Sequence, residues 1–518
     1  MTEKRKFVLR IVTVAVMAVF AIAMIVADVF AKKYNTIISQ FLGVGEQIEG
    51  DETKVNEAAK SSDELVRKIA DEGIVLLKND EVDGKPVLPL SKDNAAVNLF
   101  GFGATDSGIL LMGNGSGRSN PHPDFTVTLT EAFTECGITY NQEIIRAYEK
   151  YRKDQDKDWG TSATFNNRGS TAIKEPVTSK VLTKGIIDRA KEFSDTAVVV
   201  LSRYSGEFLG RYTQKQQIKY NLPTDTSREY NQITTEEQTL LKMCNENFKK
   251  VIVVFNTGSQ MDMTFLEGVA PDGENIGKIP AALDSGYLGQ SGAAAIPRIL
   301  FGDVSPSAKL ADTIVYNPRV NELTRFNPDT WFTNILYSEN VYVGYKFYET
   351  ADAEGYFADP NGYYADKMFG GKTGYDGVVQ FPFGHGLSYT KFDWEVEEVS
   401  LANGSELKKD SEIEIKVKVT NSGNAAGKDV VQLYYTPQYY SGGIEKPSIS
   451  LLDFAKTPTL DPSQSTTVTL KTTAYEMASY DCYDKNNNKY STWELDKGKY
   501  ELKLMIDSHN PKSGMESD

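Results

Sequence analysis

Two short apolar segments constrain the fold of this chain most strongly. Residues 196–202 read TAVVVLS and residues 251–256 read VIVVFN, and both are continuous runs rich in β-branched residues. Runs without polar alternation indicate strands buried on both faces, as in a parallel sheet that is covered by helices. Such a sheet carries its chemistry in the loops at the carboxyl ends of its strands. Glu207 lies in the loop after the first of these strands and is therefore the first candidate functional residue.

Length, charge and cysteine content limit the classes of protein to consider. The chain has 518 residues and a formal net charge of -15, and a chain of this length is expected to hold about two or three domains. A phosphate-binding surface needs clustered Lys and Arg, so nucleic acid is not an expected partner. Cys136, Cys244 and Cys482 lie far apart, and the three histidines show no ligand spacing. We expect no disulfide framework, no metal and no cofactor.

An apolar run covers residues 11–31 and is interrupted only by Thr13 and Asp28. About 20 apolar residues cross a bilayer as a helix. Four basic residues precede the run and two lysines follow it, which favours a cytoplasmic N-terminus and an extracellular location for the rest. A cleaved signal peptide is the alternative, although its apolar region is normally about 7 to 15 residues long. We expect a single-pass anchor in the cell membrane over residues 1–33, then a spacer over 34–60.

Apolar strands and helical segments alternate between residues 61 and 320. Further strands are expected at residues 73–79, 97–103, 137–141 and 279–286. Ser61 or Ser62 is expected to cap a helix that Gly73 ends, and the TTEE sequence from Thr234 is a capping box. Another helix is expected from about Gln260. This alternation predicts an α/β layered domain.

The pattern changes after residue 341. Residues 341–350, VYVGYKFYET, read as a strand, and beyond Trp394 the apolar residues alternate with a period of two between turn clusters. About seven such strands in about 120 residues predict a β-sandwich of the immunoglobulin or fibronectin type. In the last part, Asp484, Asn486 and Asn488 mimic the first ligands of a calcium loop. The later positions do not fit, so a hairpin turn is expected there.

Several longer segments occur in a fixed order along the chain. They are EGIVLLKND (72–80), GNGSGR (113–118), SRYSGE (202–207), KKVIVVFNTG (249–258), FGDVSPSAKLADT (301–313), FPFGHGLSYT (381–390) and GGIEKPSISLLDFAKT (442–457). Over residues 61–507 the chain resembles the C-terminal half of family 3 glycoside hydrolases, the β-glucosidase and β-xylosidase group. The resemblance implies a six-stranded α/β sandwich over residues 61–390 and a fibronectin type III-like β-sandwich over residues 391–518.

The resemblance also implies a chemical role for Glu207. Retaining glycosidases use two carboxyl groups about 5 to 5.5 Å apart, one as nucleophile and one as acid and then base. Glu207 is similar to the family's acid/base residue, whereas the family's nucleophile is an Asp in a Ser-Asp-Trp triplet on a barrel domain. No such triplet occurs in these 518 residues. The chain looks like circularly permuted members whose barrel comes last, so a barrel in cis or in trans is an expected partner.

The loop after Glu207 departs from the family pattern Gly-Glu-Gly-x-Asp-Arg. Phe208 and Gly210 replace the second Gly and the Asp, whereas Arg211 is kept. From spacing alone Glu207 is better explained as a solvated loop carboxylate, and only the resemblance favours the acid/base role. At an ordinary pKa of about 4.3 it would be protonated on the order of 0.2 per cent of the time at pH 7, which makes it a poor acid without a barrel to bury it.

Two functions remain open at this point. In the first, the chain is part of a membrane-anchored extracellular β-glycosidase that hydrolyses β-linked glycosides or oligosaccharides and is inactive without the barrel. In the second, it is a non-catalytic surface module that binds a glycan or a partner. The sequence predicts no individual substrate-binding residues.

Overall fold

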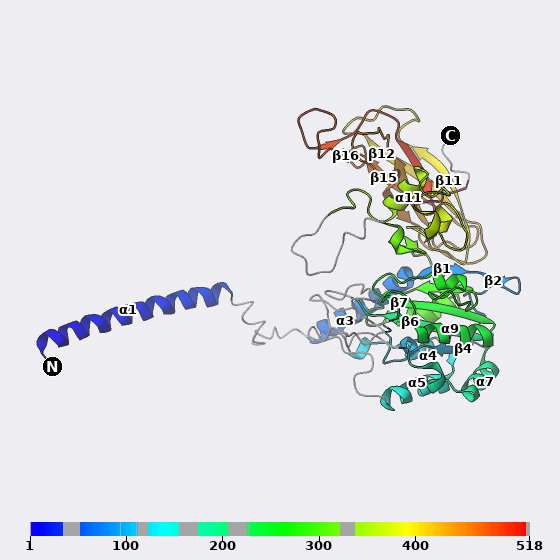
Figure 1. Cartoon of the computed structure of the whole chain (residues 1–518), viewed down its shortest axis with the longest axis horizontal. Coiled ribbons are helices and arrows are strands. Elements are labelled where there is room, and N and C mark those ends of the chain that lie inside the picture. The colour runs from blue at the N-terminus through cyan, green and yellow to red at the C-terminus, as the bar shows by residue number, and fades with distance from the viewer. Residues whose placement is uncertain are drawn as a thin grey trace. The chain divides into compact units, whose positions relative to one another are not determined.

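The computed structural model describes residues 2–34, 52–93, 95–109, 111, 123–154, 175–205, 225, 227–321 and 337–513. The chain divides into two compact units, Met1–Ser61 and Ser62–Asp518. In the first unit, helix α1 (Glu3–Lys33) is long and apolar enough to cross a membrane (Figure 1). Because an N-terminal signal sequence satisfies the same criteria of length and composition, α1 is a candidate span or a candidate leader.

Helix α3 (Glu52–Gly73) ends at the predicted residue but begins earlier than predicted. It runs without a break through Ser61 and Ser62, so the expected cap at these serines is wrong. The preceding residues, ETKVNEAAK, are mostly good helix formers, and they extend the helix by several residues toward the N-terminus.

The centre of the second unit is a six-stranded sheet, as the family resemblance implies. Its strand order is β1-β8-β7-β6-β4-β5. The strands are β1 (Val75–Asn79), β4 (Ala96–Phe100), β5 (Thr139–Tyr140), β6 (Thr196–Arg203), β7 (Lys250–Thr257) and β8 (Ala281–Asp284). Strand β1 is antiparallel to β8, and the other neighbours are parallel. The two predicted central strands pair along their whole length, from Thr196↔Lys250 to Arg203↔Thr257.

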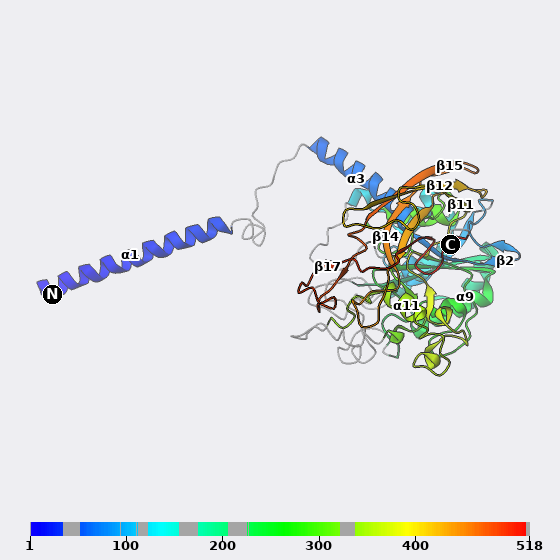
Figure 2. The same ribbon diagram turned by 90° about the horizontal axis from the view of Figure 1, so that it is seen from above.

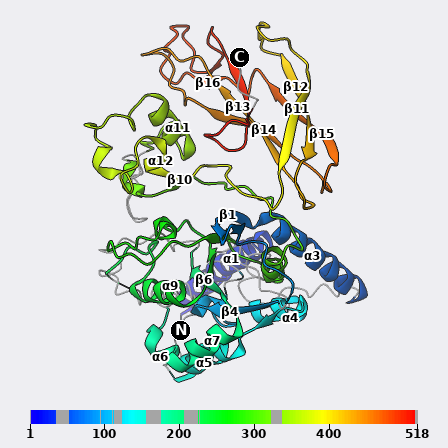
Figure 3. The ribbon, with the colours of Figure 1, turned by 90° about the vertical axis from the view of Figure 1, so that its right-hand side faces the viewer.

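Helices cover both faces of this sheet (Figure 3). One face packs against α5 (Gln142–Asp154), α7 (Lys184–Phe193) and α9 (Thr235–Asn247), and the other against α4 (Leu129–Glu135) and α10 (Ala295–Leu300). Every residue of β6 is buried. Because Val199 and Leu201 face the first core while Val198 and Val200 face the second, the continuous apolar run of β6 is explained.

The capping box before α9 is confirmed. Thr234 Oγ1 accepts a hydrogen bond from the Glu237 backbone N–H at 3.2 Å, and a Glu237 carboxylate oxygen accepts one from the Thr234 N–H at 2.7 Å. These bonds satisfy two amide groups that the first turn leaves without helical partners.

Two other local predictions are wrong. The helix expected from about Gln260 is only the short 3-10 helix η3 (Thr264–Glu267), which ends at Gly268 with a φ of 91°. The strand expected at residues 341–350 is mostly helical, because α11 spans Tyr345–Ala353. Gly344, with a φ of 58°, separates this helix from the preceding turn, and packing of Tyr348 and Ala351 overrides the β propensity of the segment.

The C-terminal part forms the predicted β-sandwich. Its two sheets have the strand orders β11-β12-β15 and β14-β13-β18. These strands are β11 (Phe392–Val399), β12 (Glu412–Asn421), β13 (Val430–Thr436), β14 (Ser450–Lys456), β15 (Ser465–Thr473) and β18 (Glu501–Met505). Strands β12 and β15 lie side by side from Glu412↔Thr473 to Thr420↔Ser465 (Figure 2). A short hairpin of β16 (Ser479–Tyr480) and β17 (Trp493–Glu494) encloses the predicted turn.

Candidate functional site

The carboxyl ends of the parallel strands meet at one edge of the sheet, where α/β proteins place their ligands. Strand β6 ends at Arg203, β7 at Thr257 and β8 at Asp284. Glu207, the predicted acid/base residue, lies outside the described residues. The last described residue before it is Ser205, two positions earlier in the sequence. The contacts described below are therefore those of residues 203–205, which directly precede the Glu207 loop.

Arg203 fixes the end of β6 through every N–H group of its guanidinium. It forms a two-pronged ion pair with Glu237 of α9, at 2.6 and 2.5 Å, and both side chains are only 5% exposed. Its three remaining N–H groups donate to the backbone carbonyl oxygens of Ser202, Tyr230 and Gln232. Burial opposes the charge of Arg203, but the attraction of Glu237 outweighs it and raises the pKa of the guanidinium.

Tyr287 clamps the backbone of the segment that follows Arg203. Its hydroxyl accepts a hydrogen bond from the Ser205 N–H at 2.6 Å and donates one to the Ser205 carbonyl oxygen at 2.9 Å. The Tyr287 ring lies so close to Gly258 that a Cβ atom there would be 2.1 Å from the ring. The Tyr230 hydroxyl donates to the Tyr204 carbonyl oxygen at 2.6 Å. Two tyrosines from different loops thus hold residues 204 and 205.

Side-chain hydrogen bonds join the ends of β6, β7 and the loop after β8. The Ser202 hydroxyl donates to Asn256 Oδ1 at 3.3 Å, and Asn256 Nδ2 donates to the Gly286 carbonyl oxygen at 2.8 Å. The Ser285 hydroxyl donates to the Phe255 carbonyl oxygen at 2.9 Å. Because these groups are buried or nearly so, their mutual bonds replace bonds to water and hold the edge rigid.

Glu175 is a half-buried acid near this edge that the sequence analysis missed. Its carboxyl oxygens accept hydrogen bonds from the Phe102 N–H and from the Tyr148 hydroxyl, both at 2.7 Å. Burial raises the pKa of Glu175 to about 8, against the effect of these two hydrogen bonds and with a contribution from the Glu237 charge. Nothing in the sequence around residue 175 signals this burial.

Asp284 is a second acid that the sequence analysis missed. It ends β8 and is half-buried, and its carboxylate accepts a hydrogen bond from the Gly286 N–H at 3.1 Å. Burial raises its pKa to about 6, and the charge of Asp312 adds to the rise. An acid that titrates near neutrality at the carboxyl edge of a sheet is a functional candidate. Its position directly after the apolar residues of AALDSG was an available signal.

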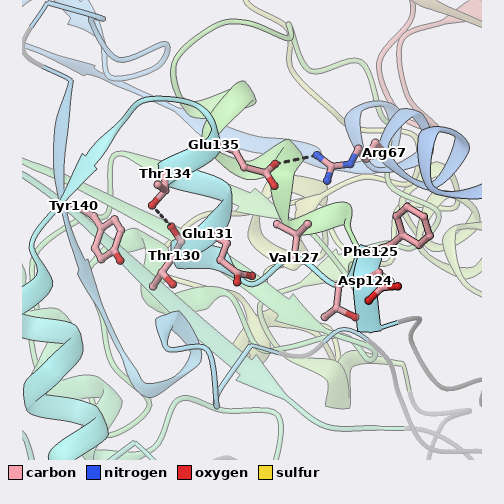
Figure 4. A pocket seen from close by; sticks show the side chains of 10 residues that line it. Arg67, Asp124, Phe125, Val127, Thr130, Glu131, Thr134, Glu135 and Tyr140 are labelled. Atoms are coloured by element: carbon pink, nitrogen blue, oxygen red, sulfur yellow. Dashed lines mark hydrogen bonds and ion pairs between the residues drawn. The ribbon is translucent and has the colours of Figure 1, made fainter. Parts of the chain in front are cut away.

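A pocket of about 390 Å³ lies beside α4 (Figure 4). Arg67 lies at its rim and pairs with Glu135 at 3.0 Å and with Asp63 at 3.1 Å, so its charge is already balanced. Glu131, which also lines the pocket, serves the capping box of α4. No lining residue comes from β6, β7 or β8, and we assign this pocket no role in the chemistry. Across the described ranges, no group of three or more His, Cys, Asp or Glu is arranged to hold a metal ion.

The fold defines a class of protein in which an α/β sandwich, whose strand ends are joined by side-chain hydrogen bonds, precedes a fibronectin-type β-sandwich. Residues 74–389 match the glycosyl hydrolase family 3 C-terminal domain, and residues 429–508 match the fibronectin type III-like domain. The chain belongs to glycoside hydrolase family 3.

Several of its relatives are β-glucosidases. The chain is 34% identical to β-glucosidase A of Butyrivibrio fibrisolvens over 473 residues, which covers 86% of this chain and 50% of the relative. It is 30% identical to a β-glucosidase of Ruminococcus albus over 440 residues, which covers 84% of this chain and 38% of that relative. The crystal structure of a β-glucosidase from Paenibacillus barengoltzii superposes with a TM-score of 0.68 at 30% identity, covering 87% of this chain and 42% of that one. The chain thus spans about half or less of the length of these relatives.

Proposed function

We propose that this chain supplies the proton-donor half of a β-glucosidase active site, with Glu207 as the acid and then the base. The observation that carries the proposal is the clamp on Ser205 at the carboxyl edge of the sheet. A general acid acts only within hydrogen-bond reach of the leaving-group oxygen, so its loop needs a fixed starting point. The names of the relatives support a β-glucoside as the substrate class.

The second carboxyl group, the nucleophile, comes in this proposal from a barrel domain in cis or in trans. The strings nearest to the family's Ser-Asp-Trp triplet are Asp158-Trp159 and Asp393-Trp394. Asp393 lies exposed on β11, which belongs to the β-sandwich and not to the six-stranded α/β sheet. Glycoside hydrolysis with retention needs both carboxyl groups, so these 518 residues by themselves are expected to be inactive.

Leaving-group dependence tests the role of Glu207. In the presence of a family barrel, Glu207→Gln should lower kcat/KM for phenyl β-glucoside far more than for 2,4-dinitrophenyl β-glucoside, because kcat/KM reports the first step and a good leaving group needs little proton donation. Asp188→Asn, at an exposed position on α7, is the matched control and should change neither rate. Equal losses of kcat/KM on both substrates would contradict the role of proton donor.

We further propose that α1 anchors the protein in the cell membrane with the chain beyond residue 34 outside. The length and apolar character of α1 and the larger number of basic residues on its N-terminal side support this topology. Membrane fractions washed with alkaline carbonate should retain the protein, and its N-terminal residues should be present in the mature chain. Release by carbonate together with loss of residues 1–33 would indicate a cleaved signal peptide instead.

A non-catalytic glycan- or partner-binding module is the second candidate function. Phe208 and Gly210, which replace the family residues after Glu207, favour it. It predicts that binding occurs and that no barrel restores turnover of any β-glucoside.

A further inference from the structure

Three aromatic rings form a cluster on the β-sandwich that is not part of its core. Tyr480 of β16 is paired with Trp493 of β17, and their ring centroids are 5.5 Å apart. Tyr475, in the turn after β15, lies with its ring centroid 6.3 Å from that of Trp493. The three residues nevertheless remain 56% (Tyr475), 47% (Tyr480) and 53% (Trp493) exposed. We call these three residues the aromatic platform.

Stability of the hairpin does not account for the exposure of these rings. The backbone N–H of Asp481 donates to the Thr492 carbonyl oxygen at 2.9 Å, which closes the loop between β16 and β17. Asn486 and Asn488 donate from their side chains to the Glu494 carboxylate at 2.8 and 2.6 Å. Because about half of each ring is exposed to water, much of the stabilisation that its burial would provide is not realised. Clusters of exposed aromatic residues are typical of binding surfaces.

We propose that the aromatic platform is a carbohydrate-binding site for neutral β-linked gluco-oligosaccharides. The face of an aromatic ring carries negative charge density and attracts the positively polarised C–H groups that line one face of a pyranose ring. The planes of Tyr475 and Tyr480 are tilted by 55° and 65° to that of Trp493. Trp493 therefore contacts one sugar unit, and a flanking tyrosine contacts the next unit of a bent chain.

The charges around the aromatic platform favour a neutral ligand. Residues 475–500, which contain all three rings, carry five acidic side chains, Glu476, Asp481, Asp484, Glu494 and Asp496, and four lysines, Lys485, Lys489, Lys497 and Lys499, so their net formal charge is only -1. Binding to an anionic membrane surface or to nucleic acid draws on an excess of positive charge. Sugar hydroxyl groups need both donors and acceptors, and this rim offers ammonium, amide and carboxylate groups.

The choice of glucose as the sugar unit rests on the proposed function, because it follows from the β-glucosidase relatives. The location of the binding site does not rest on the proposed function, since the platform lies in the β-sandwich and Glu207 lies in the α/β domain. A failure to bind and a failure to catalyse are therefore separate results. The site would hold an oligosaccharide on the protein independently of its hydrolysis.

Isothermal titration of the full chain in detergent with cellohexaose and with laminarihexaose tests the proposal. All proteins carry Glu207→Gln, so that no ligand is consumed. We expect at least one of the two sugars to bind, Trp493→Ala to weaken binding about tenfold or more, and Trp493→Phe, which keeps a ring, to weaken it about threefold or less. Phe454→Ala, at a residue that is 63% exposed on β14 outside the platform, should bind as the parent does.

Three results would overturn the proposal. The first is no binding of either sugar by the parent protein at millimolar concentration. The second is equal binding by the parent and by Trp493→Ala, with both melting at the same temperature. The third is a blue shift of tryptophan emission in phosphatidylcholine vesicles that Trp493→Ala abolishes, with no response to either sugar, which would assign the platform to a membrane surface.

Discussion

Arg203 and Glu237 form a buried, two-pronged ion pair that joins the end of the central strand β6 to the first turn of α9. The same Glu237 closes the capping box of α9 with Thr234. One carboxylate thus ties the helix start to the segment that leads toward Glu207. The segment that leads to Glu207 and the fold of the α/β domain therefore depend on a shared contact.

Replacement of Glu237 by Ala should strongly destabilise the protein. Arg203 would be left as a buried charge without its partner, a situation that typically costs about 3 to 5 kcal/mol of unfolding free energy. Urea unfolding measures this loss. Asp188→Ala removes an exposed ion pair with Lys184 at 2.6 Å and should change the free energy of unfolding far less, because water screens such pairs. If both variants lost a similar unfolding free energy, the buried ion pair would contribute no more to stability than an exposed one.

Replacement of Tyr287 by Phe should reduce turnover more than stability. The ring stays in place against Gly258, but both hydrogen bonds to the Ser205 backbone are lost. In a complex with a family barrel we expect kcat to fall about 10- to 100-fold with a smaller change in KM. Tyr490→Phe, at an exposed residue of the β-sandwich, is the control and should be unchanged. An unaltered kcat in Tyr287→Phe would show that the clamp does not position Glu207.

His509 should make stability depend on pH around neutrality. Its Nδ1 lies 3.0 Å from a carboxylate oxygen of the buried Glu349, and its ring stacks on Tyr375. Burial disfavours the charged ring, but the hydrogen bond and charge of Glu349, with Asp352 and Asp507 nearby, raise the pKa of His509.

Because the pKa is raised in the folded state, the ion pair stabilises the protein fully below the unfolded value of about 6.5 and less as the pH rises through the folded value. His509→Gln should therefore lose about 1 to 2 kcal/mol at pH 5.5 and much less at pH 9. Thermal unfolding of both proteins across this range measures the difference. A loss that is the same at both pH values would contradict a charged His509.

Glu175 should oppose folding as the pH rises. Its pKa of about 8 in the folded protein exceeds the ordinary value near 4.3, so the folded state binds more protons and the free energy of unfolding falls between these two pH values. Glu175→Gln keeps the shape without the charge, and it should be the more stable protein at pH 8 but not at pH 4.5. Glu192→Gln, at an exposed residue of α7, should follow the wild type. If the free energies of unfolding of Glu175→Gln and the wild type changed with pH in parallel, the raised pKa of Glu175 would be contradicted.

Local patterns predicted the parts of the fold that depend on neighbours in the sequence. The residues that determine the strands β6 and β7 and the capping box at Thr234 are adjacent in the sequence. All three predictions are confirmed. The segment from Tyr345 was misread, because tertiary packing of α11 outweighs the β propensity of its tyrosines. The early start of α3 was missed because a serine cap is optional when the preceding residues also favour a helix.

The site was predictable only in part. Strand ends identify an edge, and the family resemblance identifies Glu207, but the contacts that organise the edge join distant residues. Tyr287 and Ser205 are 82 positions apart, and Glu175 and Phe102 are 73 apart. Neither contact leaves a periodic signal in the sequence, and the burial that raises the pKa of Glu175 exists only after folding.

The most direct measurement compares hydrolysis of an aryl β-glucoside by this chain alone and by the chain mixed with a barrel domain of family 3 glycoside hydrolases. We expect no turnover by the chain alone, turnover in the mixture, and loss of that turnover in Glu207→Gln but not in Asp188→Asn. Turnover by the chain alone that Glu207→Gln abolishes would contradict the division of the two carboxyl groups between domains. A mixture whose turnover is indifferent to Glu207→Gln would contradict the role of Glu207 itself.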